Sequence, residues 1–217
     1  MKKALMLTLA LCATLPLVQA QDLKGDAAAG QKINAQCIGC HGIPGYQASF
    51  PEVHKVPMIS GQNAKYIVAA LNEYRKGGRK HGTMHAVASS LSDQNIADLA
   101  AYYAQQGHAA ASPEALAGQP AADVAALLAK GACVSCHGAN FNKPIDGSYP
   151  KIAGQYPDYL YVALKAYKTE GNAYVGRANA IMAGQVKQFS LKELKLLANY
   201  IGSLPAEVQT VPQSKFR

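Results

Sequence analysis

The chain has 217 residues, of which 49% are hydrophobic and 16% are charged, and its formal net charge is +8. The basic residues are scattered and form no long run, which excludes the pattern typical of nucleic-acid-binding proteins. The net positive charge is compatible with a weak attraction to an anionic membrane surface or to an acidic partner.

Residues 1–20 have the pattern of a secretory signal peptide. A basic start at Lys2 and Lys3 precedes an apolar run over residues 4–18, and Ala20 provides the small residue of a cleavage site. The run is too short and wrongly flanked for a comfortable membrane span. We therefore expect export to the periplasm and loss of Cys12 with the leader.

Two copies of the pattern C-x-x-C-H dominate the rest of the chain. The pattern is the attachment signature of a c-type haem, because two thiols three residues apart on a helical turn can add to the vinyl groups of one porphyrin. The histidine that follows directly can supply the proximal iron ligand. The copies are Cys37-Ile38-Gly39-Cys40-His41 and Cys133-Val134-Ser135-Cys136-His137.

Other uses of these cysteines explain less of the pattern. Paired C-x-x-C disulfides would not account for the histidine after each second cysteine, and the chain lacks the βαβ pattern of a redox thiol protein. A shared zinc site is disfavoured because the two motifs lie 96 positions apart. We therefore predict two covalently bound haem c groups.

An internal duplication sets the domain organisation. The offset between matching residues is 96 at the C-x-x-C-H motifs, 93 in the middle and 98 near the end, which predicts two domains instead of a solenoid. We place the signal peptide at 1–20, the first domain at 21–110 and the second at 111–217, with a short linker at the start of the second. The matching segments include residues 56–62 with 149–155 and residues 92–102 with 190–200.

Helical signals appear in chain order. Asp26 can cap a first helix that runs into Cys37. In residues 62–76 the apolar positions recur at helical spacing, and Gly77 follows as a C-terminal signal. The tail over 205–217 has little apolar content and is predicted to run over the surface.

The last helix of each unit has a clear start. Ser92 opens the first of these helices, and Ser190 with Glu193 forms a capping box at the second. No stretch alternates with period two for long enough to predict a sheet. The predicted fold class is all-α, as two tandem units.

The sixth iron ligand decides whether a haem is open to small molecules or closed and suited to electron transfer. No histidine follows His137, so Met182 is the one obvious soft ligand of the second unit, with a lysine as the alternative. The first unit offers more candidates, namely Met58, Met84, His54, His81, His85 and His108.

The repeat discriminates among these candidates. Met58 aligns with Lys151, whereas Met84 and Met182 both stand eight residues before the serine that opens the last helix. We therefore predict Met84 as the ligand, with His85 as its main rival. The other histidines of the first unit are interpreted as solvated surface residues: His54, His81 and His108.

Pro57 and Pro150 occupy equivalent positions in the two units. One role would be to bring a backbone carbonyl to the ring N–H of the proximal histidine, and a turn proline ahead of a helix is an equal alternative. Paired tyrosines are predicted to be core aromatics, with a hydroxyl available to a haem propionate in one or two cases. They are Tyr66/Tyr159, Tyr74/Tyr167 and Tyr102/Tyr200.

Together these features resemble the dihaem class I cytochromes of the cytochrome c4 family. Each C-x-x-C-H motif precedes a Pro-x-x-x-Gly-Gln segment, a helix, a methionine and a helix rich in Leu, Ala and Tyr, from Gln21 to about Leu204. The resemblance implies two class I cytochrome c domains about an approximate two-fold axis, with the haem propionate edges facing across their interface. It implies these haem-binding residues: Cys37, Cys40, His41 and Met84, then Cys133, Cys136, His137 and Met182.

The resemblance also implies a periplasmic electron carrier that donates to a membrane terminal oxidase and is sometimes loosely held at the membrane. The hypothesis is therefore an electron-transfer protein, not an enzyme, that takes single electrons from a quinol-oxidising complex or another donor. Thioether ligation would raise both reduction potentials. The alternatives are a subunit of a periplasmic dehydrogenase and a dihaem peroxidase, and the paired Met84 and Met182 argue against the peroxidase.

Overall fold

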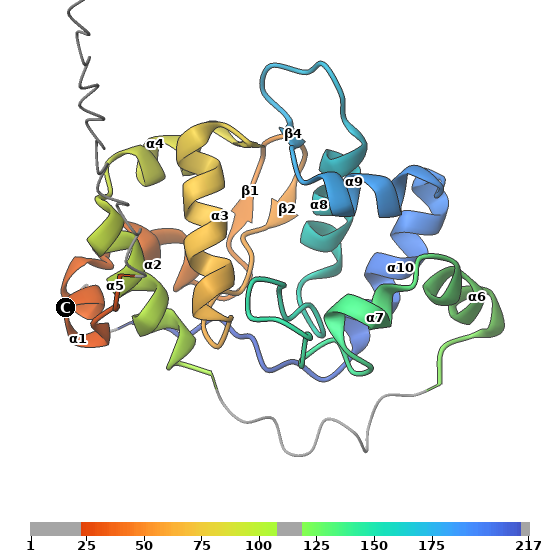
Figure 1. The fold of residues 1–217 in the computed structure, drawn as a ribbon, viewed down its shortest axis with the longest axis horizontal. Coiled ribbons are helices and arrows are strands. Elements are labelled where there is room, and N and C mark those ends of the chain that lie inside the picture. The colour runs from red at the N-terminus through yellow and green to blue at the C-terminus, as the bar shows by residue number, and fades with distance from the viewer. Residues whose placement is uncertain (1–22, 108–118, 214–217) are drawn as a thin grey trace, which may run out of the picture.

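The structure is a computed structural model, and it describes residues 23–107 and 119–213 (Figure 1). Two helical halves lie side by side, the first from the N-terminal part of the chain and the second from the C-terminal part (Figure 1). The predicted signal peptide, His108 and most of the predicted linker fall outside the described residues.

The two halves repeat the same order of helices. In each half the last helix packs against the first and third helices, and its buried face forms the centre of the hydrophobic core. The all-α prediction is confirmed. The first half holds α1 (Ala27–Ile33), α2 (Ala35–His41), α3 (Ala64–Lys76), α4 (Gly82–Ser89) and α5 (Asp93–Ala104), and the second holds α6 (Ala122–Lys130), α7 (Cys133–His137), α8 (Pro157–Lys168), α9 (Ala180–Lys187) and α10 (Leu191–Ser203).

The predicted helix starts are largely confirmed, with one difference. Asp26 caps α1, and Ser190 with Glu193 forms the capping box of α10. The prediction of a single helix that runs into Cys37 is wrong, because α1 ends at Asn34 and a second helix, α2, begins after it. The amides of Cys37 and Ile38 both return to the carbonyl of Asn34, so the chain turns there and the C-x-x-C-H motif starts a helix of its own.

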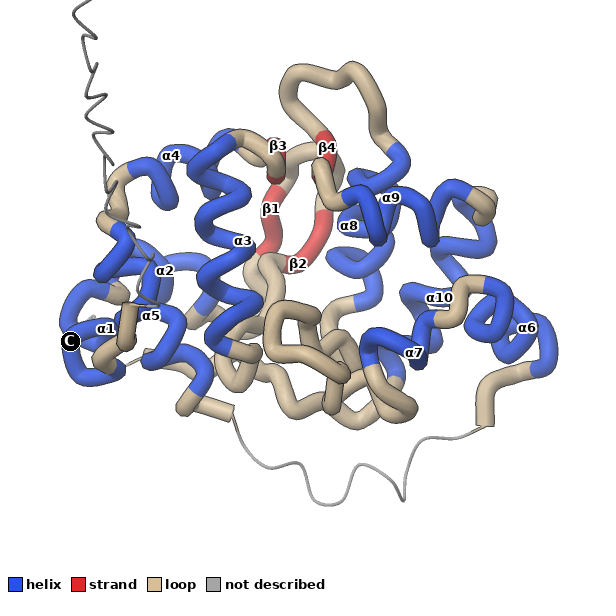
Figure 2. Tube along the Cα trace, viewed as in Figure 1, coloured by secondary structure: helices blue, strands red, loops and turns tan. Residues whose placement is uncertain are grey.

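Four strands of two residues each accompany the helices in the described ranges (Figure 2). β1 (Gln47–Ala48) pairs with β2 (His54–Lys55) inside the first half. β3 (Arg79–Lys80) pairs antiparallel with β4 (Gly176–Arg177), which joins the two halves. The strands are too short to show an alternating pattern, so the sequence could not reveal them.

The segment after α10 does not behave as predicted. It was expected to run over the surface, but Val208 is only 2% exposed and Gln209 forms a β-bridge with Ser60 of the first half. The Gln209 side chain also donates to the carbonyl of Gln106 at 2.8 Å. Backbone and amide hydrogen bonds hold this tail, which its low apolar content could not indicate.

The connections that precede the two methionines differ in length, in agreement with the rise of the repeat offset from 93 in the middle to 98 near the end. Residues 77–78 link α3 to β3, whereas residues 169–175 link α8 to β4. The longer connection forms the projecting loop between α8 and β4 in Figure 1.

Candidate functional site

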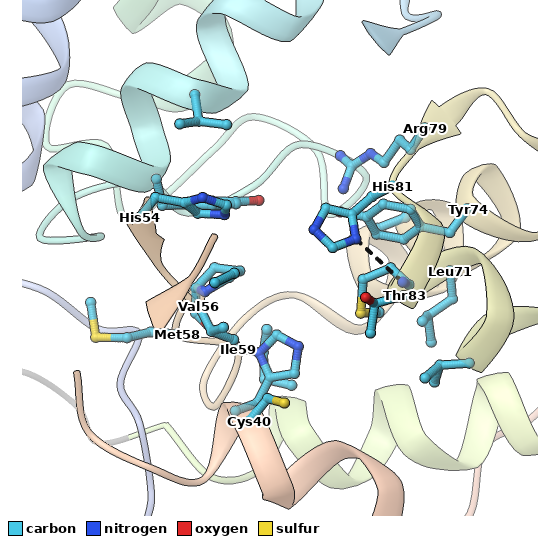
Figure 3. A pocket seen from close by; sticks show the side chains of 18 of the residues that line it. Cys40, His54, Val56, Met58, Ile59, Leu71, Tyr74, Arg79, His81 and Thr83 are labelled. Atoms are coloured by element: carbon cyan, nitrogen blue, oxygen red, sulfur yellow. Dashed lines mark hydrogen bonds between the residues drawn. The ribbon is translucent and has the colours of Figure 1, made fainter. Parts of the chain in front are cut away.

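The first C-x-x-C-H motif borders a cavity of about 430 Å³ (Figure 3). Cys37, Cys40 and His41 line it from α2, and Met84 lines it from α4. The structure thus brings the four predicted residues of the first site together around one space. Most of the remaining lining is apolar, from both halves, and includes Ile59, Ile67, Leu71, Leu99, Leu160 and Val162.

In the described residues, the four cysteines of the two motifs form no disulfide. Burial raises the pKa of Cys37 to about 11, with a further rise from Cys40 and an opposing effect from the Tyr103 hydroxyl. Burial likewise raises the pKa of Cys133. Among the residues that the structure describes, no three His, Cys, Asp or Glu side chains come together to hold a metal ion. The raised pKa values of Cys37 and Cys133 disfavour the thiolate form that redox cysteine chemistry requires.

The histidine of each motif is oriented by a proline carbonyl, which confirms that predicted role. His41 Nδ1 donates to Pro57 O at 2.8 Å, and His137 Nδ1 donates to Pro150 O at 3.1 Å. Burial lowers the pKa of both imidazoles, and the hydrogen bonds to the carbonyls oppose this only in part. Each ring is therefore neutral with its proton on Nδ1, which leaves the Nε2 lone pair for a metal.

The two predicted methionines occupy the same place on equivalent helices. Met84 is the third residue of α4, and Met182 is the third residue of α9. The amide of Met84 donates to Nδ1 of the N-cap His81 at 3.4 Å. The amide of Met182 donates to Oδ1 of the N-cap Asn179 at 2.9 Å. Each thioether therefore leaves the chain from a capped first turn.

The second site follows the same plan. Cys133, Cys136 and His137 lie on α7, and Met182 lies on α9. Cys133 and Met182 both pack against the hydrophobic core of the second half, and His137 is buried. Cys133 and Met182 thus border one core, and Cys136 and His137 lie on the same helix as Cys133.

Two histidines that were predicted to be solvated line the first cavity instead. His54 is 5% exposed and stacks on Tyr159 with ring centroids 6.3 Å apart. His81 caps α4 and lines the cavity, and Figure 3 labels both rings among the lining side chains. His54 belongs to the β1–β2 segment, which packs against α8 of the other half, and this contact buries it. The segment between His41 and Pro57 is longer than the equivalent segment between His137 and Pro150, so His54 has no matching residue in the second unit from which its burial could be inferred.

The rival ligands are placed differently. His85 is exposed, its Nδ1 bonds to the carbonyl of Tyr74, and it does not line the cavity. Met58 borders the cavity, but Figure 3 shows its side chain directed away from His81 and Thr83.

Two arginines that the sequence analysis missed complete the site. Arg79 donates to the Tyr66 hydroxyl at 2.8 Å, and Arg177 donates to the Tyr159 hydroxyl at 3.1 Å. Each guanidinium also lies over a second tyrosine ring of its own half. Both arginines stand five residues before the predicted methionine, so the internal repeat could have revealed them.

No carboxylate of the described residues balances the charge of these guanidinium groups. Within residues 23–107 and 119–213, neither Arg79 nor Arg177 forms an ion pair with a carboxylate, although Arg79 is only 9% exposed. A buried guanidinium is costly without a negative partner. A haem carries two propionates, so the thiols, the imidazole, the thioether and the unpaired arginine at this cavity all fit that group.

Comparisons with known proteins agree with this chemistry. A family model described as Cytochrome c matches residues 27–106 and, a second time, residues 121–205. The chain is 31% identical over 217 residues to a cytochrome c4 of Azotobacter vinelandii, covering 94% of this chain and all of that protein. It is 28% identical over 202 residues to a thiosulfate dehydrogenase electron acceptor of Stutzerimonas stutzeri, covering 84% of this chain and 89% of that one.

A solved structure gives the same result for the fold. The cytochrome c4 structure of Acidithiobacillus ferrooxidans superposes with a TM-score of 0.61 at 26% identity, covering 79% of this chain and 100% of that one. In the described part of the chain, no helix is long and apolar enough to cross a membrane.

Proposed function

Since the chain belongs to the cytochrome c family and, within it, to the cytochrome c4 group, we propose that it is a periplasmic electron carrier between a quinol-oxidising complex, or another donor, and a membrane terminal oxidase. Its two covalently bound haem c groups supply one-electron iron couples. The repeated pairing of one methionine with each C-x-x-C-H motif along the chain carries the proposal, because two protein ligands close an iron to substrates.

In this proposal each residue has a defined task. The cysteine pairs Cys37/Cys40 and Cys133/Cys136 hold the two porphyrins through thioether bonds. His41 and His137 are the proximal ligands, oriented by the proline carbonyls that accept their Nδ1 protons. The distal ligands, Met84 and Met182, leave the first turns of α4 and α9.

The arginines and tyrosines are assigned to the propionates. Arg79 and Arg177 supply positive charge, and Tyr66 and Tyr159 fix the direction of each guanidinium through their hydroxyl oxygens. Arginine suits carboxylates because its planar fork presents several N–H groups at once. The cation also opposes oxidation of a nearby iron, which adds to the rise in potential from thioether ligation.

The location and the membrane contact belong to the same proposal. The signal-peptide pattern of residues 1–20 supports the periplasm. Without Lys2 and Lys3 of that segment the formal net charge falls from +8 to +6, which supports no more than a weak peripheral association with an anionic membrane.

A second candidate has support from one relative. The similarity to the thiosulfate dehydrogenase electron acceptor favours a role as the electron-accepting partner or subunit of a periplasmic dehydrogenase. Mild extraction separates the two functions, because a subunit co-purifies with its dehydrogenase at a fixed ratio and a free carrier does not. A dihaem peroxidase has less support, because it requires one iron with an open position.

Spectroscopy of the holoprotein tests the central proposal. A pyridine haemochrome count should give two haems per chain, and the ferric protein should show the long-wavelength absorption band of methionine ligation. Met84→Ala and Met182→Ala should each remove about half of that band, and Met58→Ala should leave it unchanged. One haem per chain, or an unchanged band in both ligand variants, would overturn the proposal.

A further inference from the structure

Two glutamines reach across the boundary between the domains in opposite directions. Gln155 accepts from the amide of Met58 through Oε1 at 3.0 Å and donates from Nε2 to the Met58 carbonyl at 2.8 Å. Gln62 makes the same pair of bonds with Lys151, each at 2.9 Å. Both glutamines are 4% exposed, so these bonds are shielded from water.

The peptide groups that the glutamines bind are those that orient the proximal histidines. The amide N–H of Met58 and the carbonyl of Pro57 belong to one peptide group, and that carbonyl accepts from His41. One planar unit therefore has His41 of its own domain on one side and Gln155 of the other domain on the opposite side.

The second domain repeats this relay. The carbonyl of Pro150 accepts from His137, and the N–H of the same peptide group, which belongs to Lys151, donates to Gln62. The relays are thus crossed, since the glutamine of each domain ends the hydrogen-bond chain that starts at the histidine of the other.

The glycine before each glutamine makes this reach sterically feasible. Gly61 has φ +83°, and a β-carbon there would lie 2.5 Å from the Glu207 carbonyl oxygen. Gly154 has φ +66°, and a β-carbon there would lie 2.7 Å from the Leu204 carbonyl oxygen. The Pro-x-x-x-Gly-Gln segment therefore makes two kinds of contact. Its proline carbonyl accepts from the histidine of its own domain, and its glutamine binds a peptide group of the other domain.

We propose that Gln155 and Gln62 are positioning residues that act in trans, Gln155 on His41 and Gln62 on His137. The inference rests on the proposed function, in which these histidines are the proximal ligands. An N–H that donates to Oε1 polarises its peptide group and makes the carbonyl at the other end a stronger acceptor. A carbonyl that accepts more strongly from Nδ1–H makes the imidazole donate more electron density to the iron through Nε2, which favours the oxidised state of the haem iron.

The test uses the full-length holoprotein with each haem resolved by NMR during a redox titration. Gln155→Leu should shift the first-domain haem toward its reduced form by about twofold or more at a fixed potential, and leave the second-domain haem unchanged. Gln62→Leu should do the opposite, so each variant is the control of the other. Hydrogen exchange adds a readout that is independent of the haems, because the Met58 amide should exchange faster only in Gln155→Leu.

The outcomes separate this inference from the proposed function. A shift confined to the haem of the mutated domain, equal shifts in both haems, or no shift would overturn the crossed assignment and leave the carrier function intact. Failure of the unmodified protein to show two haems with histidine and methionine ligands would overturn the function itself. If a leucine variant does not fold, Gln155→Asn and Gln62→Asn, whose amides are one carbon too short to reach, take its place with the same expected shifts.

Discussion

Arg79 and Arg177 are register partners in the antiparallel β3–β4 pair, so the two domains bring their arginines together on one short ribbon. Each guanidinium is held by a tyrosine of its own domain. Two neighbouring cations in a half-buried setting repel each other unless anions lie close by. The ribbon is therefore the place where the propionates of both haems would neutralise the protein's charge.

Replacing either arginine should change one reduction potential. Arg79→Gln should lower the potential of the first-domain haem by the equivalent of about 1 kcal/mol or more, because a nearby cation favours the reduced iron. Arg177→Gln should act in the same way on the second-domain haem. Redox titration measures both effects, and the control is Arg75→Gln, whose partner is the exposed Asp93. Equal effects of Arg75→Gln and Arg79→Gln would show that net charge, not placement, is responsible.

The N-caps of α4 and α9 should control how firmly each methionine is held. His81→Ala should weaken the first turn of α4 by about 1 kcal/mol, because the Met84 amide loses its acceptor. The long-wavelength band of the first-domain haem should then disappear at a lower temperature. His81→Asn, which copies the second domain's Asn179, should restore the band's thermal stability. A band that is equally stable in His81→Ala would contradict this role.

Acid should weaken the contact between β2 and α8. Burial raises the pKa of Asp158, but hydrogen bonds from the Lys55 ammonium and from the Tyr159 and Lys55 amides outweigh it, so the pKa lies below its usual value. A carboxylate whose pKa is lowered by folding stabilises the protein above its unfolded pKa of about 3.9, and this contribution is lost as pH falls through the folded pKa.

The pH prediction is checked by a difference in melting temperature. Above about pH 4 the wild type should melt at a higher temperature than Asp158→Asn. The corresponding difference in the free energy of unfolding should be no more than about 1 kcal/mol, because the side chains of Lys55 and Asp158 are both partly exposed, and it should vanish at lower pH. Glu193→Gln is the control, because that carboxylate caps α10 within the second domain. The Lys55 amide donates to Asp158, so the loss of Glu193 should leave hydrogen exchange at this amide unchanged. A difference that grows toward acid pH would contradict the assignment.

The segment after α10 should contribute to the docking of the domains. A stop codon after Leu204 removes the Gln209–Ser60 bridge and the buried Val208, so we expect faster hydrogen exchange at Ser60 and a lower melting temperature. Val208→Ala should cost about 2 kcal/mol, since it removes two buried methyl groups. A stop codon after Gln213 keeps every described contact of the segment and serves as the control. Unchanged hydrogen exchange at Ser60 in the protein that ends at Leu204 would contradict a docking role.

Local signals and the internal repeat made much of this architecture predictable. Ser190 and Glu193 specify a helix start through atoms three residues apart, so no knowledge of the rest of the fold is needed. The repeat selected Met84 over Met58, and the structure places Met84 at the equivalent of Met182. The proline carbonyls were anticipated because both units place a proline at the same position.

What could not be predicted depends on contacts between the halves. His54 is buried because the β1–β2 segment rests on α8, and no property of the segment itself indicates this. The tail is held through backbone atoms of Gln209, which every residue possesses. The turn at Asn34 separates two helices that were predicted as one, and no glycine or proline stands at residues 31–36 to indicate it.

The crossed glutamines also bear on the origin of the chain. Gln62 on Lys151 and Gln155 on Met58 form an isologous contact, in which the same patch on each unit meets itself about a two-fold axis. A single unit that carried this patch could recognise a second copy of itself without any linker. The duplicated chain thus holds covalently an arrangement that a homodimer of one-haem units could form by association, and fusion fixes the ratio of the two units at one to one.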